Sequence, residues 1–256
     1  VHNDIGINLD VNSASLGVSS VIGMDIDVVG HSGAAAVHTA TGLTVNVSGA
    51  DTNYAALFNG GNVGIGTAAP THGLHVVAVA ASGIKIESPN NPLLTFYDTH
   101  ANAGSRNWEI GTNEVAWGDF TIRQSNARGG DPQTAGTTRF YIDTSGNVGI
   151  GAVPKVWNSG YDSLQIGKSG TMSSYSGADV DRMWVSANAY LHTDGTWKRI
   201  LTDTASQHEQ HSGVHNFYTA VSGSGDVTIT WVKNMVIDAN SRISLSNNDD
   251  GLSNTI

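Results

Sequence analysis

The stretch SGNVGIG at residues 145–151 decides the fold, and nearly the same string, GGNVGIG, occupies residues 60–66. A divergent third copy, NSRISLS, lies at residues 240–246. The segments that precede the three copies are ALFNG (56–60), FYIDT (140–144) and MVIDA (235–239). Because apolar residues alternate on both sides of the turn, each copy predicts a strand, a turn and a second strand.

The distance between copies indicates what the motif does in the chain. Aligning Gly61, Gly146 and Ser241 gives spacings of 85 and 95 residues. These spacings exceed the period of roughly 20–50 residues that is typical of solenoid repeats. We therefore interpret the copies as recurring joints between separate modules.

Glycine alternates with apolar residues in the second strand of the motif. Gly149 and Gly151 leave one face of this strand almost bare, and the other face carries only Val148 and Ile150. Ordering a residue costs about 1–2 kcal/mol, whereas each buried apolar side chain returns only about 1.5–3 kcal/mol. The strand therefore needs partners. Glycine permits the close backbone approach that three identical chains winding round one axis would require.

These strings resemble segments of bacteriophage tail fibres and similar trimeric virion adhesins, in which IDSSGNVGIGT-like segments punctuate long β-structured shafts. The matching strings are YIDTSGNVGIG (141–151), LFNGGNVGIGTAAPTHGLHV (57–76) and VIDANSRISLS (236–246), with further similarity in RNWEIG (106–111), GDFTIRQSNARGGDP (118–132), DGTWKRI (194–200) and ITWVKNMVIDA (229–239). The resemblance implies a non-enzymatic, homotrimeric segment of a virion, outside the cell, that works in host attachment. It implies other tail or baseplate proteins and a host surface glycan or protein as partners.

The composition predicts an all-β chain and disfavours two classes of partner. Charged residues make up 13% of the 256 residues, about half the usual share near 25%, and 31 glycines suit turns better than long helices. The net charge of −10 argues against nucleic acid, which requires a basic footprint. No apolar run approaches the roughly 20 residues of a membrane span, so we expect no membrane insertion.

Cysteine is absent, so no disulfide framework supports the chain outside the cell, and stability would have to come from burial between chains. The start VHNDIGINLD lacks the basic and apolar regions of a secretory signal. We interpret the chain as part of a longer protein.

We expect an elongated homotrimeric fibre segment with β-prism or β-helix-like joints and small β-sandwich-like modules. Residues 1–66 would form an N-terminal shaft, because GINLDVNS (6–13), GMDIDVVG (23–30) and GLTVNVSG (42–49) repeat one alternating pattern. The other divisions are a first β module at 67–139, the SGNVGIG joint at 140–166, a second β module at 167–232 and a truncated C-terminal joint at 233–256.

Short strands between Gly, Asn and Pro turns predict a sandwich or barrel in the first module. The expected strands are 74–79, 83–88, 92–98, 107–111, 119–124 and 139–143. The side chains expected to face inward are Ile84, Ile86, Leu94, Phe96, Trp108, Ile110, Phe120 and Ile122. The segment RGGDPQTAGT at 128–137 is expected to be an exposed loop, where contact with a partner is plausible.

The second module contains the strongest local signal, AYLHTDGTWKRI at 189–200, which predicts a two-residue type I′ hairpin at Asp194-Gly195. The predicted register separates two faces. Ala189, Leu191 and Ile200 should face the core. The candidate receptor-binding or glycan-binding face gathers Tyr190, His192, Trp197 and Arg199, because flat aromatic surface beside hydrogen-bond donors suits a sugar. The alternative, which we favour, is that Trp197 packs under a neighbouring chain.

The segment DTASQHEQH at 203–211 predicts the one short helix, with Asp203 or Thr204 as its cap and Gly213 as its end. Strands are expected at 215–221 and 226–232. His208, His211 and His215 would lie roughly on one helix face and are weak candidates for a metal site, whose ligands threefold symmetry would multiply. We favour a polar segment that is rich in histidine by accident, and we expect no metal and no cofactor.

Two rival functions remain open. A catalytic tailspike would need paired carboxylates about 5–9.5 Å apart, for which Glu109 with Glu114 and Asp179 with Asp181 are the candidates. Neither pair stands out among eighteen aspartates and four glutamates. A trimeric bacterial surface adhesin would carry a coiled-coil stalk, and the sequence shows no heptads.

Overall fold

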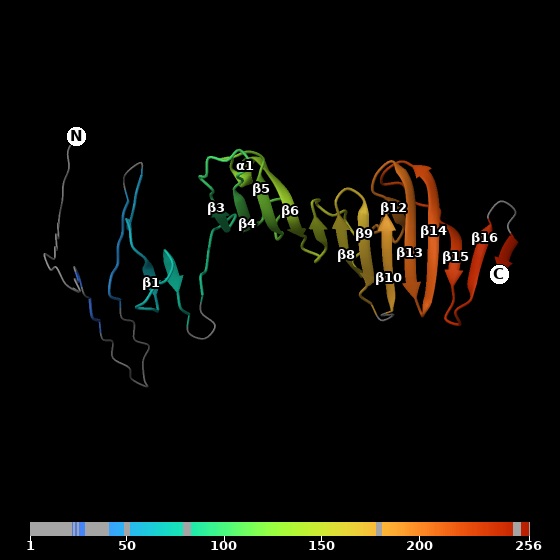
Figure 1. Cartoon of the computed structure of the whole chain (residues 1–256), viewed down its shortest axis with the longest axis horizontal. Coiled ribbons are helices and arrows are strands. Elements are labelled where there is room, and N and C mark those ends of the chain that lie inside the picture. The colour runs from blue at the N-terminus through green and yellow to red at the C-terminus, as the bar shows by residue number, and fades with distance from the viewer. Residues whose placement is uncertain are drawn as a thin grey trace, which may run out of the picture. The chain divides into compact units, whose positions relative to one another are not determined.

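The computed structural model describes residues 22, 24, 26–28, 41–48, 52–78, 83–177, 181–247 and 252–255. The chain divides into two compact units, Val1–Gly83 and Ile84–Ile256. Nearly all regular structure in the described ranges is β-strand, which confirms the predicted all-β class (Figure 1). Within these ranges, no helix combines the length and the hydropathy that crossing a membrane would need.

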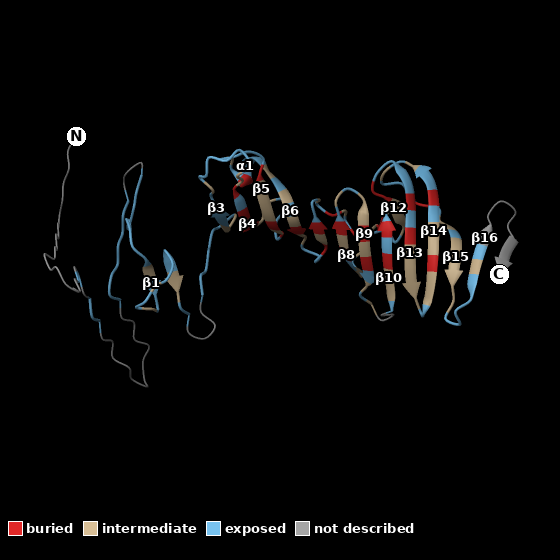
Figure 2. Ribbon diagram, in the orientation of Figure 1, coloured by how far each residue is buried: buried red, intermediate tan, exposed pale blue. Residues whose placement is uncertain are grey.

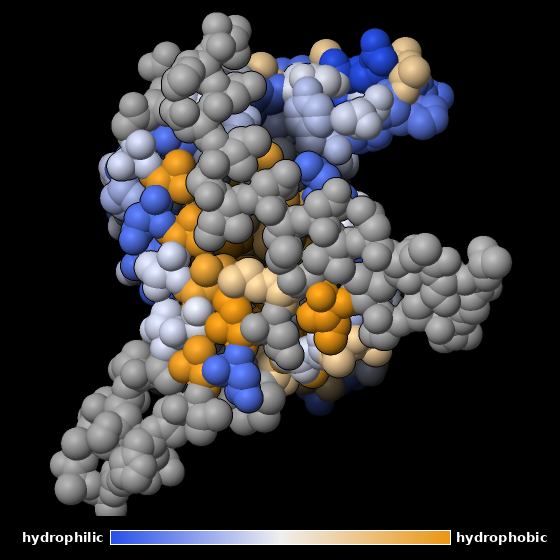
Figure 3. All heavy atoms as spheres, turned by 90° about the vertical axis from the view of Figure 1, so that its left-hand side faces the viewer, coloured by the Kyte–Doolittle hydropathy of each residue, from blue (hydrophilic) through white to orange (hydrophobic). Residues whose placement is uncertain are grey.

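In the described part of the first unit, two short strands, β1(Val63–Ile65) and β2(Leu74–Val76), pair in parallel. The repeat at 6–13 lies outside the described residues, and the described residues of the repeats at 23–30 and 42–49 are not in strands. Their apolar side chains are exposed, namely Met24, Ile26, Val28, Leu43, Val45 and Val47. Hydrophobic residues also reach the surface in the space-filling view of Figure 3. The described part of this unit therefore leaves its alternating apolar residues uncovered.

The second unit is built on one thirteen-stranded sheet, in which the strands follow one another in chain order (Figure 1). Its strands are β3(Leu93–Phe96), β4(Trp108–Thr112), β5(Phe120–Ser125), β6(Gly136–Ile142), β7(Val148–Ile150), β8(Tyr161–Ile166), β9(Gly170–Tyr175), β10(Arg182–Ala187), β13(Asp203–His211), β14(Val214–Gly223), β15(Val232–Ile237), β16(Ile243–Asn247) and β17(Leu252–Thr255). Neighbours are antiparallel except for the parallel pair β7 and β8. β10 pairs with β13, because β11(Ala189–Leu191) and β12(Trp197–Arg199) form a separate two-stranded sheet.

Several sequence predictions are confirmed by these strands, and others are not. The strands expected at 92–98, 107–111, 119–124, 139–143 and 215–221 overlap β3, β4, β5, β6 and β14. No strand forms at 83–88. The loop expected at 128–137 contains the four-residue helix α1(Pro132–Ala135), which the Asp131 side chain caps. Apart from β2, β11 and β12, the described strands of both predicted modules belong to one sheet rather than to two sheets packed face to face.

The repeated motif forms the predicted strand, turn and strand in its second and third copies. In the turn between β6 and β7, one oxygen of Asp143 accepts hydrogen bonds from the backbone N–H groups of Ser145 (2.8 Å) and Asn147 (2.9 Å). Asp238 accepts the equivalent pair of bonds between β15 and β16. The first copy has Phe58 at the position of Asp143, and only its second strand forms. The aspartate therefore closes the turn.

The backbone conformation of the turns also supports the alignment of the second copy of the motif with the third. Gly146 has a φ of 86°, and Ser241, which aligns with it, has a φ of 64°. A serine rarely adopts this conformation unless its surroundings impose it. The divergent third copy therefore adopts the same backbone conformation in its turn as the second copy.

The backbone of the same chain leaves room only for glycine at the centre of the motif. A Cβ added to Gly149 would lie 2.1 Å from the carbonyl oxygen of Ala152. Gly64 is the equivalent residue of the first copy, and a Cβ added there would lie 2.4 Å from the carbonyl oxygen of Thr67. The close neighbour of each glycine is thus the backbone three residues later. This differs from the expectation that glycine makes room for other chains. The segment after Gly149 crosses the sheet, where Lys155 N–H donates to Gln165 (3.0 Å), and so allows the parallel pairing of β7 with β8.

One face of the sheet carries two rows of mainly apolar side chains, and we call it the apolar face. Directly paired residues share a face, and the register places two rows of side chains on it. The first row is Phe120, Ile142, Val148, Leu164, Met172, Val185, His208, Phe217, Met235 and Leu245; the second is Leu94, Ile110, Ile122, Phe140, Ile150 and Ile166. Within this chain these side chains are exposed or half-buried, and none is buried.

Along several strands, buried residues alternate with exposed or half-buried ones (Figure 2), and the buried residues lie on the opposite face, which we call the polar face. Its buried residues include Glu109, Thr121, Tyr141, Gln165, Thr171, Trp184, Gln207 and Asn216. The sequence predicted that the apolar side chains of the first module face inward. This prediction was wrong, because within the chain the polar face is the covered one. Ile84, Ile86, Leu94, Phe96 and Trp108 are exposed, and Ile110, Phe120 and Ile122 are half-buried. The physical reason is that the chain's own loops cross the polar face and satisfy its polar groups, as when Asn107 donates to Gly130 O (2.6 Å).

Candidate functional site

The polar face carries a cavity of about 450 Å³ between β8, β9, β10, β13, β14 and the hairpin of β11 and β12. Six aromatic side chains line it, namely Tyr161, Tyr175, Trp184, Trp197, Tyr218 and Trp231. Its polar lining comprises Asn158, Arg182, Gln207 and Glu209. We call this site the aromatic cavity.

The aromatic rings follow one another around the cavity without stacking in parallel. The ring centroids of Tyr161 and Trp184 are 5.4 Å apart, and those of Trp184 and Trp197 are 5.6 Å apart, with interplanar angles of 53° and 59°. Trp197 meets Trp231 at 6.4 Å and 75°. Tilted and edge-to-face contacts are the preferred geometry of aromatic pairs. The rings therefore hold one another in place, and none of these pairs is stacked face to face.

The polar groups of the cavity form one network. A carboxylate oxygen of Glu209 accepts hydrogen bonds from the Tyr218 hydroxyl (2.8 Å) and the Asn216 amide (3.2 Å). The other lies 3.7 Å from Nε of Arg182, whose guanidinium lies 5.6 Å from the centre of the Trp184 ring. Burial, together with the bond to Glu209, raises the pKa of Tyr218 above its ordinary value, so this hydroxyl stays protonated at neutral pH. The network holds balanced charge, one cation beside one anion.

Two side-chain donors near the cavity make no hydrogen bond within the chain. Nε of Arg182 and Nε1 of Trp231 are buried and make no hydrogen bond. A buried donor without a partner costs about 1–3 kcal/mol. Both atoms are shielded from solvent, and Nε of Arg182 faces the carboxylate of Glu209 at 3.7 Å.

The structure does not bring the four predicted receptor-binding residues together on an exposed face. Trp197 lines the aromatic cavity, but Tyr190 and Arg199 are buried. The Tyr190 hydroxyl donates to Asp226 (2.9 Å). Arg199 donates to backbone carbonyls, among them that of Val221 (2.6 Å). His192 is half-buried, 3.1 Å from Asp194.

The reason is the register of the hairpin. The turn is a three-residue one, in which His192 N–H donates to Thr196 O (2.9 Å) and Gly195 has a φ of 79°, as expected for a type I turn followed by a left-handed residue. Leu191 therefore pairs with Trp197, not with Lys198. A slip of one residue moves side chains to the opposite face, so Tyr190 and His192 lie on one face and Trp197 and Arg199 on the other. Of the residues expected in the core, Ala189, Leu191 and Ile200 are buried.

The predicted helix at 203–211 is wrong, because this segment is β13, paired on both sides with β10 and β14. Strand alternation places His208 on the apolar face and His211 on the polar face, beside Arg182 (3.1 Å). His208 Nε2 lies 3.0 Å from His215 Nδ1, and burial lowers the pKa of His208. The three histidines therefore do not converge. In the described ranges, no three His, Cys, Asp or Glu side chains gather as a metal ion would require.

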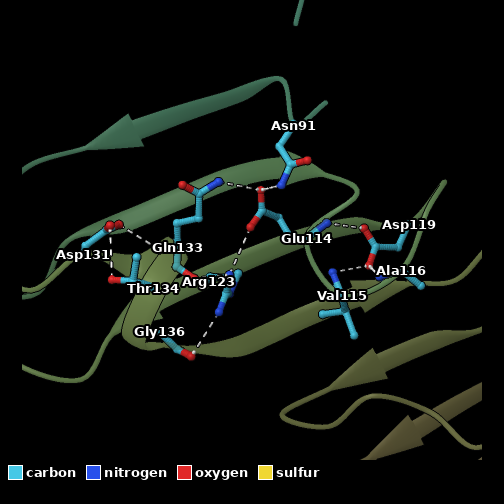
Figure 4. A network of polar contacts seen from close by, with 10 residues as sticks. All are labelled: Asn91, Glu114, Val115, Ala116, Asp119, Arg123, Asp131, Gln133, Thr134 and Gly136. Atoms are coloured by element: carbon cyan, nitrogen blue, oxygen red, sulfur yellow. Dashed lines mark hydrogen bonds and ion pairs between the residues drawn. The ribbon is translucent and has the colours of Figure 1, made fainter. Parts of the chain in front are cut away.

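Of the first pair of carboxylates considered for hydrolysis, Glu114 is held by the chain's own groups (Figure 4). Glu114 accepts from Arg123 (3.0 Å) and Asn91 (3.2 Å), and its side chain is 1% exposed. Asp119 accepts from the backbone N–H groups after Glu114 and so closes that loop. Glu109 is buried on the polar face, where burial and the nearby Glu114 raise its pKa.

The second candidate pair is only partly described. Asp179 lies outside the described residues. Asp181 accepts a hydrogen bond from Ser212 N–H (2.9 Å), which ties the start of β10 to the turn that follows β13. The contacts of Asp181 are those of a structural residue.

Sequence reasoning found only Trp197 among the residues that line the cavity. The available signal was the placement of aromatic residues at positions that alternate with apolar ones, as Trp184 does between Met183 and Val185. Neither known protein families nor curated proteins give a match to this chain.

Proposed function

We propose that the chain is a segment of a homotrimeric phage tail fibre that works in attachment to the host cell. The observation that carries the proposal is the apolar face, which lies uncovered while the polar face is buried. Ile150, Ile166 and Val185, from three different strands, are 45%, 47% and 41% exposed.

A surface of this kind is unusual on a protein that stays monomeric. Monomers rarely expose contiguous apolar patches larger than a few hundred Å², and each Å² left in water forgoes about 25 cal/mol. Copies of the same chain carry the same rows of side chains, so a closed symmetric assembly can bury all of these faces together. The recurring glycine turns, which resemble those of trimeric virion fibres, favour three copies over two.

Association through the apolar face leaves the polar face directed away from the other copies. The loops, α1 and the aromatic cavity all lie on the polar side of the sheet, where they would be accessible to partners. The partners we propose are other tail or baseplate proteins and a glycan or protein of the host surface. The location that follows from this proposal is the virion, outside the cell.

The oligomeric state of the purified chain tests the proposal. We expect light scattering to give the mass of a trimer, and we expect Val185→Asp to abolish association, because it places charge at the centre of the apolar face. The matched control is Val156→Asp, since Val156 is 70% exposed and lies in the segment that crosses the polar face. A monomeric wild-type chain, or a Val185→Asp variant that assembles normally, would contradict the proposal.

Attachment itself is tested on virions. Antibodies raised against this chain should label the fibres of particles produced from the genome that encodes it. Labelling of the capsid instead would contradict a role in the tail.

A further inference from the structure

We propose that the aromatic cavity binds one ring of a neutral sugar. The inference rests on the proposed function only for the source of that sugar, a glycan of the host surface. Binding itself follows from the residues of the cavity.

The walls of the cavity suit the apolar side of a sugar ring. A pyranose carries its C–H groups on flat faces and its hydroxyls around the edge. The face of an aromatic ring is electron-rich and attracts such polarised C–H groups. Trp184, Trp197 and Trp231 meet one another at 59° and 75° and not in parallel stacks. A volume of about 450 Å³ falls in the usual range for small-molecule sites, roughly 300–1,000 Å³.

The polar groups of the cavity suit the hydroxyl edge of the same ring. Glu209 supplies acceptor oxygens, the Arg182 guanidinium supplies N–H donors, and both side chains line the cavity. Gln207 is 5% exposed and is positioned by a hydrogen bond to Ser186 (3.1 Å). A sugar hydroxyl both donates and accepts, so it can satisfy such a mixed set of groups.

Charge selects a neutral ligand. Arg182 and Glu209 lie 3.7 Å apart, so each already faces an opposite charge, and the cavity holds no excess of either. An acidic sugar would be repelled by Glu209. A quaternary ammonium group, which aromatic cages also recognise, would meet the guanidinium beside Trp184.

The position of the cavity keeps it accessible in an assembly. Trp184 alternates with Met183 and Val185 on β10, and Glu209 alternates with His208 on β13. The side chains that line the cavity therefore point away from the apolar face. Copies that associate through that face leave the cavity open to solvent.

Titration of the purified chain with simple ligands, followed by tryptophan fluorescence, tests the inference. The probes are the methyl glycosides of neutral hexoses and N-acetylhexosamines, with glucuronate and choline as the charged comparisons. We expect a neutral glycoside to bind with a Kd of about 1 mM and the charged probes not to bind. Failure of every neutral probe, or preference for choline or glucuronate, would overturn the inference.

Substitutions in the cavity test whether the glycoside binds there. Trp231→Ala should weaken it about tenfold or more, as loss of a buried aromatic anchor does, and Glu209→Gln should weaken it while keeping the shape of the cavity. Trp117→Ala is the control, because Trp117 is 73% exposed and lies outside the cavity. If Trp231→Ala does not fold, Tyr218→Phe replaces it, since it removes only a hydroxyl. Binding that survives the cavity substitutions overturns the assignment.

Light scattering on the same samples separates the two proposals. Trimers that bind no sugar contradict the cavity and leave the fibre proposal intact. Monomers that bind a neutral glycoside support the cavity and contradict the fibre proposal.

Discussion

Replacing Gly149 with alanine should destabilise the second unit through a clash within the chain. The added Cβ would lie 2.1 Å from Ala152 O and 2.9 Å from Cδ of Pro154, whereas ordinary contact begins at 3.4 Å. The carbonyl would have to retreat by about 1.3 Å, the difference between 3.4 and 2.1 Å. The segment that must move also carries the bond from Lys155 N–H to Gln165. The substitution therefore strains both the crossing segment and its anchor on the sheet.

The size of the effect follows from two destabilising terms and one that offsets them. Overpacking costs about 1–3 kcal/mol, and a weakened hydrogen bond adds about 0.5–1.5 kcal/mol. Replacing glycine restricts the unfolded chain and offsets about 0.4–1 kcal/mol. We expect a net loss of about 0.5–4 kcal/mol, which lowers the Tm of a unit of this size by about 1–16 °C. Thermal unfolding followed by circular dichroism measures it.

The control for this prediction is Gly83→Ala, because no atom lies within 4 Å of the added Cβ. Its Tm should match the wild type. If Gly149→Ala melts like the wild type and loses only its oligomeric state, the glycine serves contact between chains, and the reasoning from Ala152 is refuted.

Two further predictions concern single carboxyl groups. Asp143→Ala removes the acceptor for the Ser145 and Asn147 N–H groups and should lower the free energy of unfolding by about 1–3 kcal/mol, as denaturant titration will measure; unchanged stability would mean that the turn closes without the aspartate. Glu109 has a pKa raised above 4.5 by burial, so its stabilising contribution is complete below pH 4.5 and is lost as the pH rises through the raised pKa. Glu109→Gln should therefore gain stability relative to the wild type between acidic and neutral pH, and parallel pH profiles of the two proteins would contradict this.

Much of the β structure was predictable because its signals are local. Alternation in FTIRQ and RFYID predicts the side of each strand on which a residue lies, and the structure keeps Phe120, Ile122 and Phe140 together on one face. The turn after β6 was predictable for the same reason. Its Asp143 and left-handed Gly146 need only neighbouring residues to form it.

Other predictions failed where distant contacts compete with local preference. DTASQHEQH has helix formers and a plausible cap, but β10 and β14 offer hydrogen bonds along both edges of the segment, and it becomes a strand. The dipeptide Asp194-Gly195 suits a two-residue turn, yet the hairpin closes with three residues. This register buries Tyr190, Leu191 and Arg199 at once.

The sequence alone therefore determined the all-β class, the positions of most strands and the joint motif, since these depend on residues a few places apart. Only the tertiary structure decided which face of the sheet is covered, because alternation separates two faces without stating what packs on either. The tertiary structure also decided which side chains line the aromatic cavity. Tyr161, Trp184, Tyr218 and Trp231 come from distant parts of the chain and meet only because the sheet sets their strands side by side.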